Sequence, residues 1–106
     1  MFGHYFQKIL NHFFSLPLPF SILPQALNNF KDAAENGVVL AQYKLAEMYF
    51  IGETGSQDYE NAFKWFKKAA EQGLVEAQYN TAVCYADGLG IKKSSAEASE
   101  TLAQIV

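Results

Sequence analysis

The sequence predicts an all-α protein: an α/α solenoid of helix-turn-helix repeats with a 36-residue period, preceded by a separate amino-terminal helix. Three observations lead to this prediction. Much of the stretch 26–52 recurs 36 positions later, apolar side chains within each copy follow helical spacing, and glycines stand where helices should end. With 106 residues, 50% of them hydrophobic, and a formal net charge of −3, the chain should fold as one domain.

The first 20 residues form a segment of their own. Large apolar side chains recur there about once per helical turn, at Phe2, Phe6, Ile9 and Phe13. This spacing predicts a short amphipathic helix over residues 1–14. Pro17 and Pro19 exclude a helix from residues 15–20, because proline lacks a backbone donor and disfavours helix in the residue before it. We therefore divide the chain into a helix and proline linker at 1–20 and a repeat domain at 21–106.

The amino-terminal segment predicts neither a secretory signal nor a membrane span. His4 and Lys8 interrupt its apolar run, and a transmembrane helix takes about 20 apolar residues. Cys84 is the single cysteine, so an intrachain disulfide framework is excluded and the cellular compartment stays open.

The internal repeat is clearest at residues 33–37, where Ala-Ala-Glu-Asn-Gly recurs as Ala-Ala-Glu-Gln-Gly at 69–73. Ala-Gln-Tyr at 41–43 likewise recurs at 77–79, and a third, partial copy begins at Ala98. Such self-similarity at a fixed period is typical of repeat architectures.

Each copy predicts two helices, here called helix A and helix B. Helix A is expected at 21–36, 58–72 and 94–106, and helix B at 39–51 and 75–86. Asp58 is a suitable N-cap, Pro24 is tolerated near a helix start, and loops are expected near Gly37, Gly52, Gly73 and Gly88.

The recurring aromatics predict a core between stacked helices. We expect five of them to act as wedges between helices: Tyr43, Tyr49, Phe66, Tyr79 and Tyr85. The second helix B should have one apolar side with Val75, Tyr79, Ala82 and Tyr85, and another side of small residues with Ala77, Thr81 and Cys84.

Three stretches of the repeat are specific enough to indicate a family. They are Ala-Phe-Lys-Trp-Phe-Lys-Lys-Ala-Ala-Glu-Gln-Gly at 62–73, Glu-Ala-Gln-Tyr-Asn at 76–80 and Tyr-Ala-Asp-Gly-Leu-Gly at 85–90. Over about residues 24–106 the chain resembles the Sel-one-like repeats, an α/α solenoid class related to tetratricopeptide repeats. Tetratricopeptide repeats themselves are the alternative, but their period is about 34 and their closing proline is absent here.

Two positions depart from the family pattern. Gly52 and Gly55 are spaced more widely than Gly88 and Gly90, which leaves the turn geometry open. The third copy has Thr101-Leu102 where Trp65-Phe66 stand, which indicates a degenerate terminal repeat.

The sequence predicts no enzyme, no cofactor and no metal site. His4 and His12 have no third ligand nearby, and Cys84 has neither a base nor an orienting group, so a small hydrolase acting through its thiol is only a remote alternative. The mild acidity and the lack of a basic block argue against nucleic acid as a partner.

The candidate binding surface is a polar band on helix A around one large aromatic residue. By resemblance, the helix A surface of this family receives partner segments. The band consists of Gln25, Asn29, Asp32, Asn61, Trp65, Lys68, Glu97, Thr101 and Gln104. The alternative is an ordinary solvated face with Trp65 packed against the neighbouring repeat.

Two functions are therefore in competition. The first is a non-catalytic protein–protein interaction module, an adaptor or regulatory scaffold that binds a protein or peptide on helix A. The second is a terminal or truncated solenoid piece that self-associates through Leu102, Ile105 and Val106, since stable solenoids usually need about three repeats.

Overall fold

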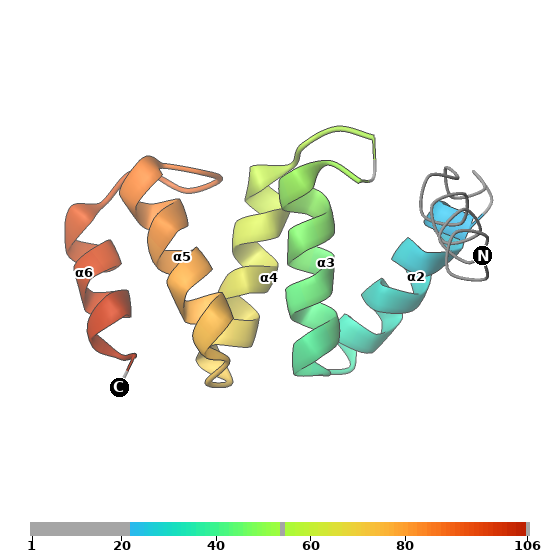
Figure 1. Ribbon diagram of the computed structural model, residues 1–106, viewed down its shortest axis with the longest axis horizontal. Coiled ribbons are helices and arrows are strands. Elements are labelled where there is room, and N and C mark those ends of the chain that lie inside the picture. The colour runs from blue at the N-terminus through green and yellow to red at the C-terminus, as the bar shows by residue number, and fades with distance from the viewer. Residues whose placement is uncertain (1–21, 54, 106) are drawn as a thin grey trace, which may run out of the picture.

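The computed structural model describes residues 22–53 and 55–105, which form five α-helices and no strand. The helices stand side by side in an elongated row, each antiparallel to the next (Figure 1). They are α2 (Ile22–Glu35), α3 (Val39–Ile51), α4 (Tyr59–Glu71), α5 (Val75–Asp87) and α6 (Ser95–Ala103). The all-α solenoid prediction is confirmed, whereas the expected amino-terminal helix, its linker and both histidines lie outside the described residues.

The helix bounds repeat with the expected period. Both ends of α3 recur in α5 at a shift of 36 residues, and the last residue of α2 recurs as the last residue of α4. Short turns join α2 to α3 and α4 to α5 along the lower edge of the row, and longer loops join the repeats along its upper edge (Figure 1).

The two longer loops close in the same way although their glycines are spaced differently. Gly52 and Gly88 both take the left-handed conformation that ends helix B, with φ of 91° and 71°. Each loop is then held by one backbone bond of 2.9 Å: the Asp58 N–H donates to the Tyr49 carbonyl, and the Ser94 N–H donates to the Tyr85 carbonyl. The wider glycine spacing therefore leaves the anchor points of the loop unchanged.

Side-chain caps start the later A helices. Asp58 accepts a bond from the Asn61 backbone N–H at 3.1 Å, which confirms it as an N-cap, and Ser94 Oγ accepts from the Glu97 N–H at 3.2 Å. Hydrogen bonds from the Asn61 side chain and backbone lower the pKa of the Asp58 carboxyl.

The last helix ends earlier than the sequence pattern suggested. It stops at Ala103, and the next two amides bond three residues back, from Gln104 to Thr101 and from Ile105 to Leu102, in a tighter final turn. Ile105 therefore follows the helix instead of continuing it.

The core is an aromatic and alanine cluster centred on α3 and α4, to which α2 adds Ala34 and α5 adds Cys84. Edge-to-face pairs hold the rings together: Phe63 and Tyr85 have centroids 5.1 Å apart, and Phe50 lies 6.0 Å from Phe66. The small side of α5 is buried as expected, since Ala77 and Cys84 are inaccessible and Thr81 is 3% exposed.

One expected core wedge was wrong. Tyr79 is 58% exposed and Val75 is 50% exposed. The reason is visible one repeat earlier, where the ring of Tyr43 packs 5.7 Å from Phe66. The residue of α6 at the position of Phe66 is Leu102, which is smaller and is itself 46% exposed, so Tyr79 has no equivalent aromatic partner.

A glutamine at the same place in both repeats ties helix B to the end of helix A. The side chain of Gln42 donates to the Ala34 carbonyl at 3.1 Å, and Gln78 donates to the Ala70 carbonyl at 3.5 Å. Gln42 also accepts from the Gln72 side chain at 2.8 Å, so it links α2 and α3 to the end of α4.

Candidate functional site

The main candidate site is a groove between α4 and α6, floored by α5, which we call the α4–α6 groove. Its volume is about 240 Å³. Its walls are formed by Lys67, Ala70, Glu71, Thr81, Tyr85, Glu97, Glu100, Thr101 and Gln104. Three helices therefore contribute to one hollow, which makes it a feature of the stacked repeats and not of any single helix.

The threonines in the groove have their hydroxyls satisfied by their own helices. Thr81 Oγ1 donates to the Ala77 carbonyl at 2.7 Å, and Thr101 Oγ1 donates to the Glu97 carbonyl at 2.8 Å. The ring of Tyr85 is held in place by its edge-to-face contact with Phe63. The two threonine hydroxyls therefore need no hydrogen bond from a ligand.

The rim of the groove is charged and mainly acidic. Three carboxylates, those of Glu71, Glu97 and Glu100, and one ammonium group, that of Lys67, line the groove, and all four residues are exposed. The α6 wall carries two of the carboxylates, whereas the α4 wall carries one carboxylate and the ammonium group, so the net charge of the rim is negative.

The same geometry one repeat earlier contains an indole instead of a hollow. We call the packing of α2, α3 and α4 the first junction and that of α4, α5 and α6 the second junction. Trp65 holds the position of Thr101 and belongs to the buried cluster together with Ala34 and Leu45. These three residues are 6%, 1% and 0% exposed, respectively.

Two lysines accompany the indole of Trp65. The Nζ of Lys64 lies 5.3 Å from the ring centroid and that of Lys68 lies 4.8 Å from it, both within the range of cation–π attraction. At the equivalent positions in the second junction stand Glu100 and Gln104. The two junctions therefore differ in both volume and charge.

The nine residues of the sequence-predicted band form three equivalent sets. Glu97, Thr101 and Gln104 line the α4–α6 groove together. Asn61, Trp65 and Lys68 belong to the first junction, where Asn61 donates to Asp58 and the indole is buried. Gln25, Asn29 and Asp32 are exposed on α2.

Sequence reasoning missed the opposite wall and the floor of the groove. Lys67, Ala70 and Glu71 come from α4, and Thr81 and Tyr85 come from α5. The signal that pointed to them was the replacement of Trp65 by Thr101 in the third copy, because losing an indole opens space beside every residue that surrounds it.

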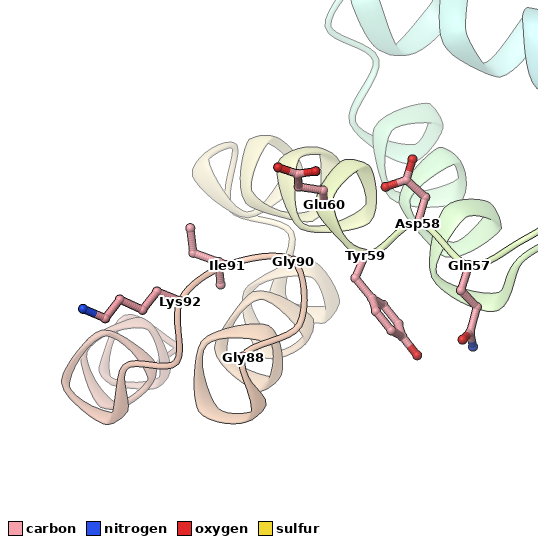
Figure 2. A pocket seen from close by; sticks show the side chains of 8 residues that line it. All are labelled: Gln57, Asp58, Tyr59, Glu60, Gly88, Gly90, Ile91 and Lys92. Carbon is pink, nitrogen blue, oxygen red and sulfur yellow. The ribbon is translucent and has the colours of Figure 1, made fainter.

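Two other hollows lie on the described part of the chain. A wide depression of about 580 Å³ lies over the start of α4 and the loop after α5, and its side chains point in different directions rather than toward a common centre (Figure 2). A smaller hollow of about 130 Å³ lies between α3 and α5 and is lined partly by Phe50, Ile51 and Phe66.

Cys84 is inaccessible in the α5 core, which confirms the predicted burial. Desolvation, together with the nearby charge of Asp87, raises the pKa of its thiol to about 11. In the described part of the chain, the His, Cys, Asp and Glu side chains form no group of three that could hold a metal ion. None of the helices between residues 22 and 105 has the length and hydrophobicity of a membrane span.

Comparison with known proteins supplies the family. The sequence profile of the Sel1 repeat matches residues 39–74 and 75–98, which is more than half of the chain. The chain belongs to the Sel1 repeat family. Each matched unit begins at helix B, so the first one contains α3 and α4 and the second contains α5 and the start of α6.

Two solved Sel1 repeat structures resemble the chain. A Sel1 repeat protein from Oxalobacter formigenes is 34% identical with a TM-score of 0.67, and the match covers 76% of this chain and 33% of that one. The protein c5321, a protective antigen of uropathogenic Escherichia coli strains with an SLR fold, is 43% identical with a TM-score of 0.72. That match covers 76% of this chain and 17% of c5321.

The chain thus spans a third or less of either solved protein. No curated protein matches its sequence. Sel1 repeats generally serve as non-catalytic scaffolds for protein–protein interaction.

Proposed function

We propose that the chain is a non-catalytic protein-interaction module, an adaptor or regulatory scaffold, that receives a segment of a partner protein at the α4–α6 groove. The observation that carries the proposal is the groove itself, in which three of the predicted helix A residues line one hollow with a charged rim. Interfaces place a few anchoring side chains in such hollows and surround them with polar contacts.

The remaining predicted residues extend this surface along the array. Lys68 and the exposed side chains of α2, namely Gln25, Asn29 and Asp32, continue the helix A surface beyond the groove. Asn61 and Trp65 support it from inside the first junction, where they cap and pack α4. In this arrangement the partner is anchored between α4 and α6 and contacts the earlier A helices with polar groups.

Photo-crosslinking tests the proposal. A photoreactive benzoylphenylalanine at Gln104, on the groove rim, should capture a partner protein in a cell extract, and Thr101→Trp should abolish the capture by filling the groove. The matched control is Leu40→Trp, which adds the same indole at a position 70% exposed on α3. Equal capture with Thr101→Trp and wild-type protein would contradict binding at the groove.

A second function, self-association at the carboxy-terminal end, is favoured by a specific observation. Leu102 and Tyr79 are 46% and 58% exposed, although their counterparts Phe66 and Tyr43 pack together. Burial of such a patch contributes about 25 cal/mol per Å² before association costs. Of the other residues predicted to take part, Ile105 is half-buried and Val106 lies outside the described residues.

We expect dimers or larger species that become monomers when Leu102→Glu or Ile105→Glu is introduced. Light scattering after gel filtration measures this over a range of concentrations. Glu100→Gln, on the same helix, is the control and should leave the mass unchanged. A monomer at high concentration in the wild-type chain would exclude this second function.

A further inference from the structure

We infer that the α4–α6 groove binds an aromatic side chain, above all an indole, that a partner peptide presents next to Lys or Arg. This inference rests on the proposed function and names the chemistry of the partner. It comes from the repeat itself: at the equivalent place in the first junction, the chain fills the space with Trp65 and flanks the ring with two lysines.

The size of the groove suits one large side chain. Its volume of about 240 Å³ is below the range of about 300–1,000 Å³ that is typical of pockets for whole drug-sized ligands. The Thr81 and Thr101 hydroxyls are already bonded within their helices, so these two side chains demand no polar group from the occupant. The ring of Tyr85, which packs edge-to-face against Phe63, offers an aromatic surface for the occupant to pack against.

The charge of the groove calls for a cation beside the ring. In the first junction the cations that approach the indole belong to the chain, at Lys64 and Lys68. In the second junction the same two positions carry Glu100 and Gln104. Glu97 and Glu71 add two carboxylates to the rim and Lys67 adds one ammonium group, so carboxylates outnumber cations there. The occupant must therefore bring its own positive charge, which the carboxylates would stabilise.

A second copy of this chain does not provide an exposed indole. The sequence has one tryptophan, and its indole is 6% exposed inside the first junction. An indole for the groove has to come from another protein, which separates this site from the self-association patch at Leu102.

Binding of three short capped peptides tests the inference. The peptides are acetyl-Lys-Trp-Lys-amide, acetyl-Lys-Ala-Lys-amide and acetyl-Glu-Trp-Glu-amide, and binding is followed by NMR shifts of the Thr81 and Thr101 methyl groups. We expect saturable shifts with Lys-Trp-Lys and at least about tenfold weaker binding of the other two. Equal binding of Lys-Trp-Lys and Lys-Ala-Lys, or shifts located elsewhere on the protein, would overturn the inference.

Two variants make the test specific. Thr101→Trp should abolish binding of Lys-Trp-Lys, provided that its circular dichroism shows an intact helical fold. Glu100→Lys places at the rim the residue that the first junction has at Lys64, so it should weaken Lys-Trp-Lys and strengthen Glu-Trp-Glu. An unchanged order of affinities in Glu100→Lys would also overturn the inference.

The outcome is distinguishable from failure of the proposed function. If all three peptides bind equally weakly while Thr101→Trp still abolishes photo-crosslinking from Gln104, the groove binds its partner through other side chains and only this inference is wrong. If crosslinking persists in Thr101→Trp, the groove is not the binding site and the proposed function is wrong as well.

Discussion

The first and second junctions share their backbone plan and differ in what occupies the space between their A helices. Both have a helix B that ends in a left-handed glycine and a loop anchored by one 2.9 Å backbone bond. In the first junction the space holds Trp65, and in the second it is a groove beside Thr101. Side-chain differences within a shared backbone plan therefore separate a filled core from an open groove.

The residues around Trp65 and Thr101 also differ, and those of the second junction are smaller or less buried. The first junction has Leu45 on helix B, fully buried, where the second has the smaller and more polar Thr81. Ala34 is 1% exposed in the first junction, whereas its counterpart Ala70 is only half-buried. The first junction thus stabilises the array through burial, and the second gives up part of that burial for accessible surface.

The largest effect should come from removing the indole. Trp65→Ala deletes a buried side chain that fills the first junction, and we expect it to lower the free energy of unfolding by about 3–5 kcal/mol. Chemical denaturation followed by circular dichroism measures the effect, because the variant has no tryptophan fluorescence. Thr101→Ala is the matched change in the second junction and should alter the free energy by less than about 1 kcal/mol. Similar losses in both variants would refute the difference between the junctions.

A second large effect is expected in the loop that closes the second junction. A Cβ at Gly90, where φ is 74°, would overlap the Tyr59 carbonyl and the next amide at the start of α4. Gly90→Ala should therefore add a steric clash to the backbone strain of about 1–3 kcal/mol that a left-handed alanine carries. Gly37→Ala, at φ 88° in the first junction, has open space around its Cβ and should show the strain alone. Thermal unfolding of the two variants should show the larger loss for Gly90→Ala.

The fold was predictable from the sequence because its signals are local and repeated. The 36-residue spacing of glycines, the Asp58 cap and the small residues of α5 each fix a turn, a helix start or a close contact without reference to distant side chains. The helix bounds therefore came out within a few residues of the structure, apart from the early end of α6 at Ala103.

The candidate site was only partly predictable. A helical wheel placed Glu97, Thr101 and Gln104 on one face, but the opposite wall, with Lys67 and Glu71, depends on how α6 packs against α5. The same limit explains the wrong prediction for Tyr79. Its position repeats that of Tyr43, yet its burial depends on the residue across the junction, which is Leu102 instead of an aromatic.

Filling the groove should recover part of the missing burial. Thr101→Trp gives the second junction the residue of the first, and we expect the free energy of unfolding to rise by about 0.5–2 kcal/mol, as is common for cavity-filling changes. The gain should be smaller than the loss in Trp65→Ala, because Thr81 and Ala70 surround the new indole less completely than Leu45 and Ala34 surround the native one. Leu40→Trp is again the control, and a Thr101→Trp protein less stable than this control would show that the groove does not accept an indole.

The smallest effect on stability at neutral pH is expected at a position that is buried in both junctions. Cys84 and its counterpart Met48 are both buried, at 0% and 2% exposure. Because burial raises the pKa of the Cys84 thiol to about 11, the native protein should react with a thiol reagent at pH 8 far more slowly than the unfolded chain. The thiol ionises at a lower pH in the unfolded chain, so its contribution to stability is complete below that unfolded pKa and is lost as the pH rises toward about 11. The free energy of unfolding should therefore fall more steeply above pH 9 in the wild-type chain than in Cys84→Ala, a control without this titration in which the slope with pH, not the absolute stability, is compared. Fast stoichiometric labelling of the native protein at pH 8 would show instead that the α5 core opens readily, and with it the floor of the α4–α6 groove.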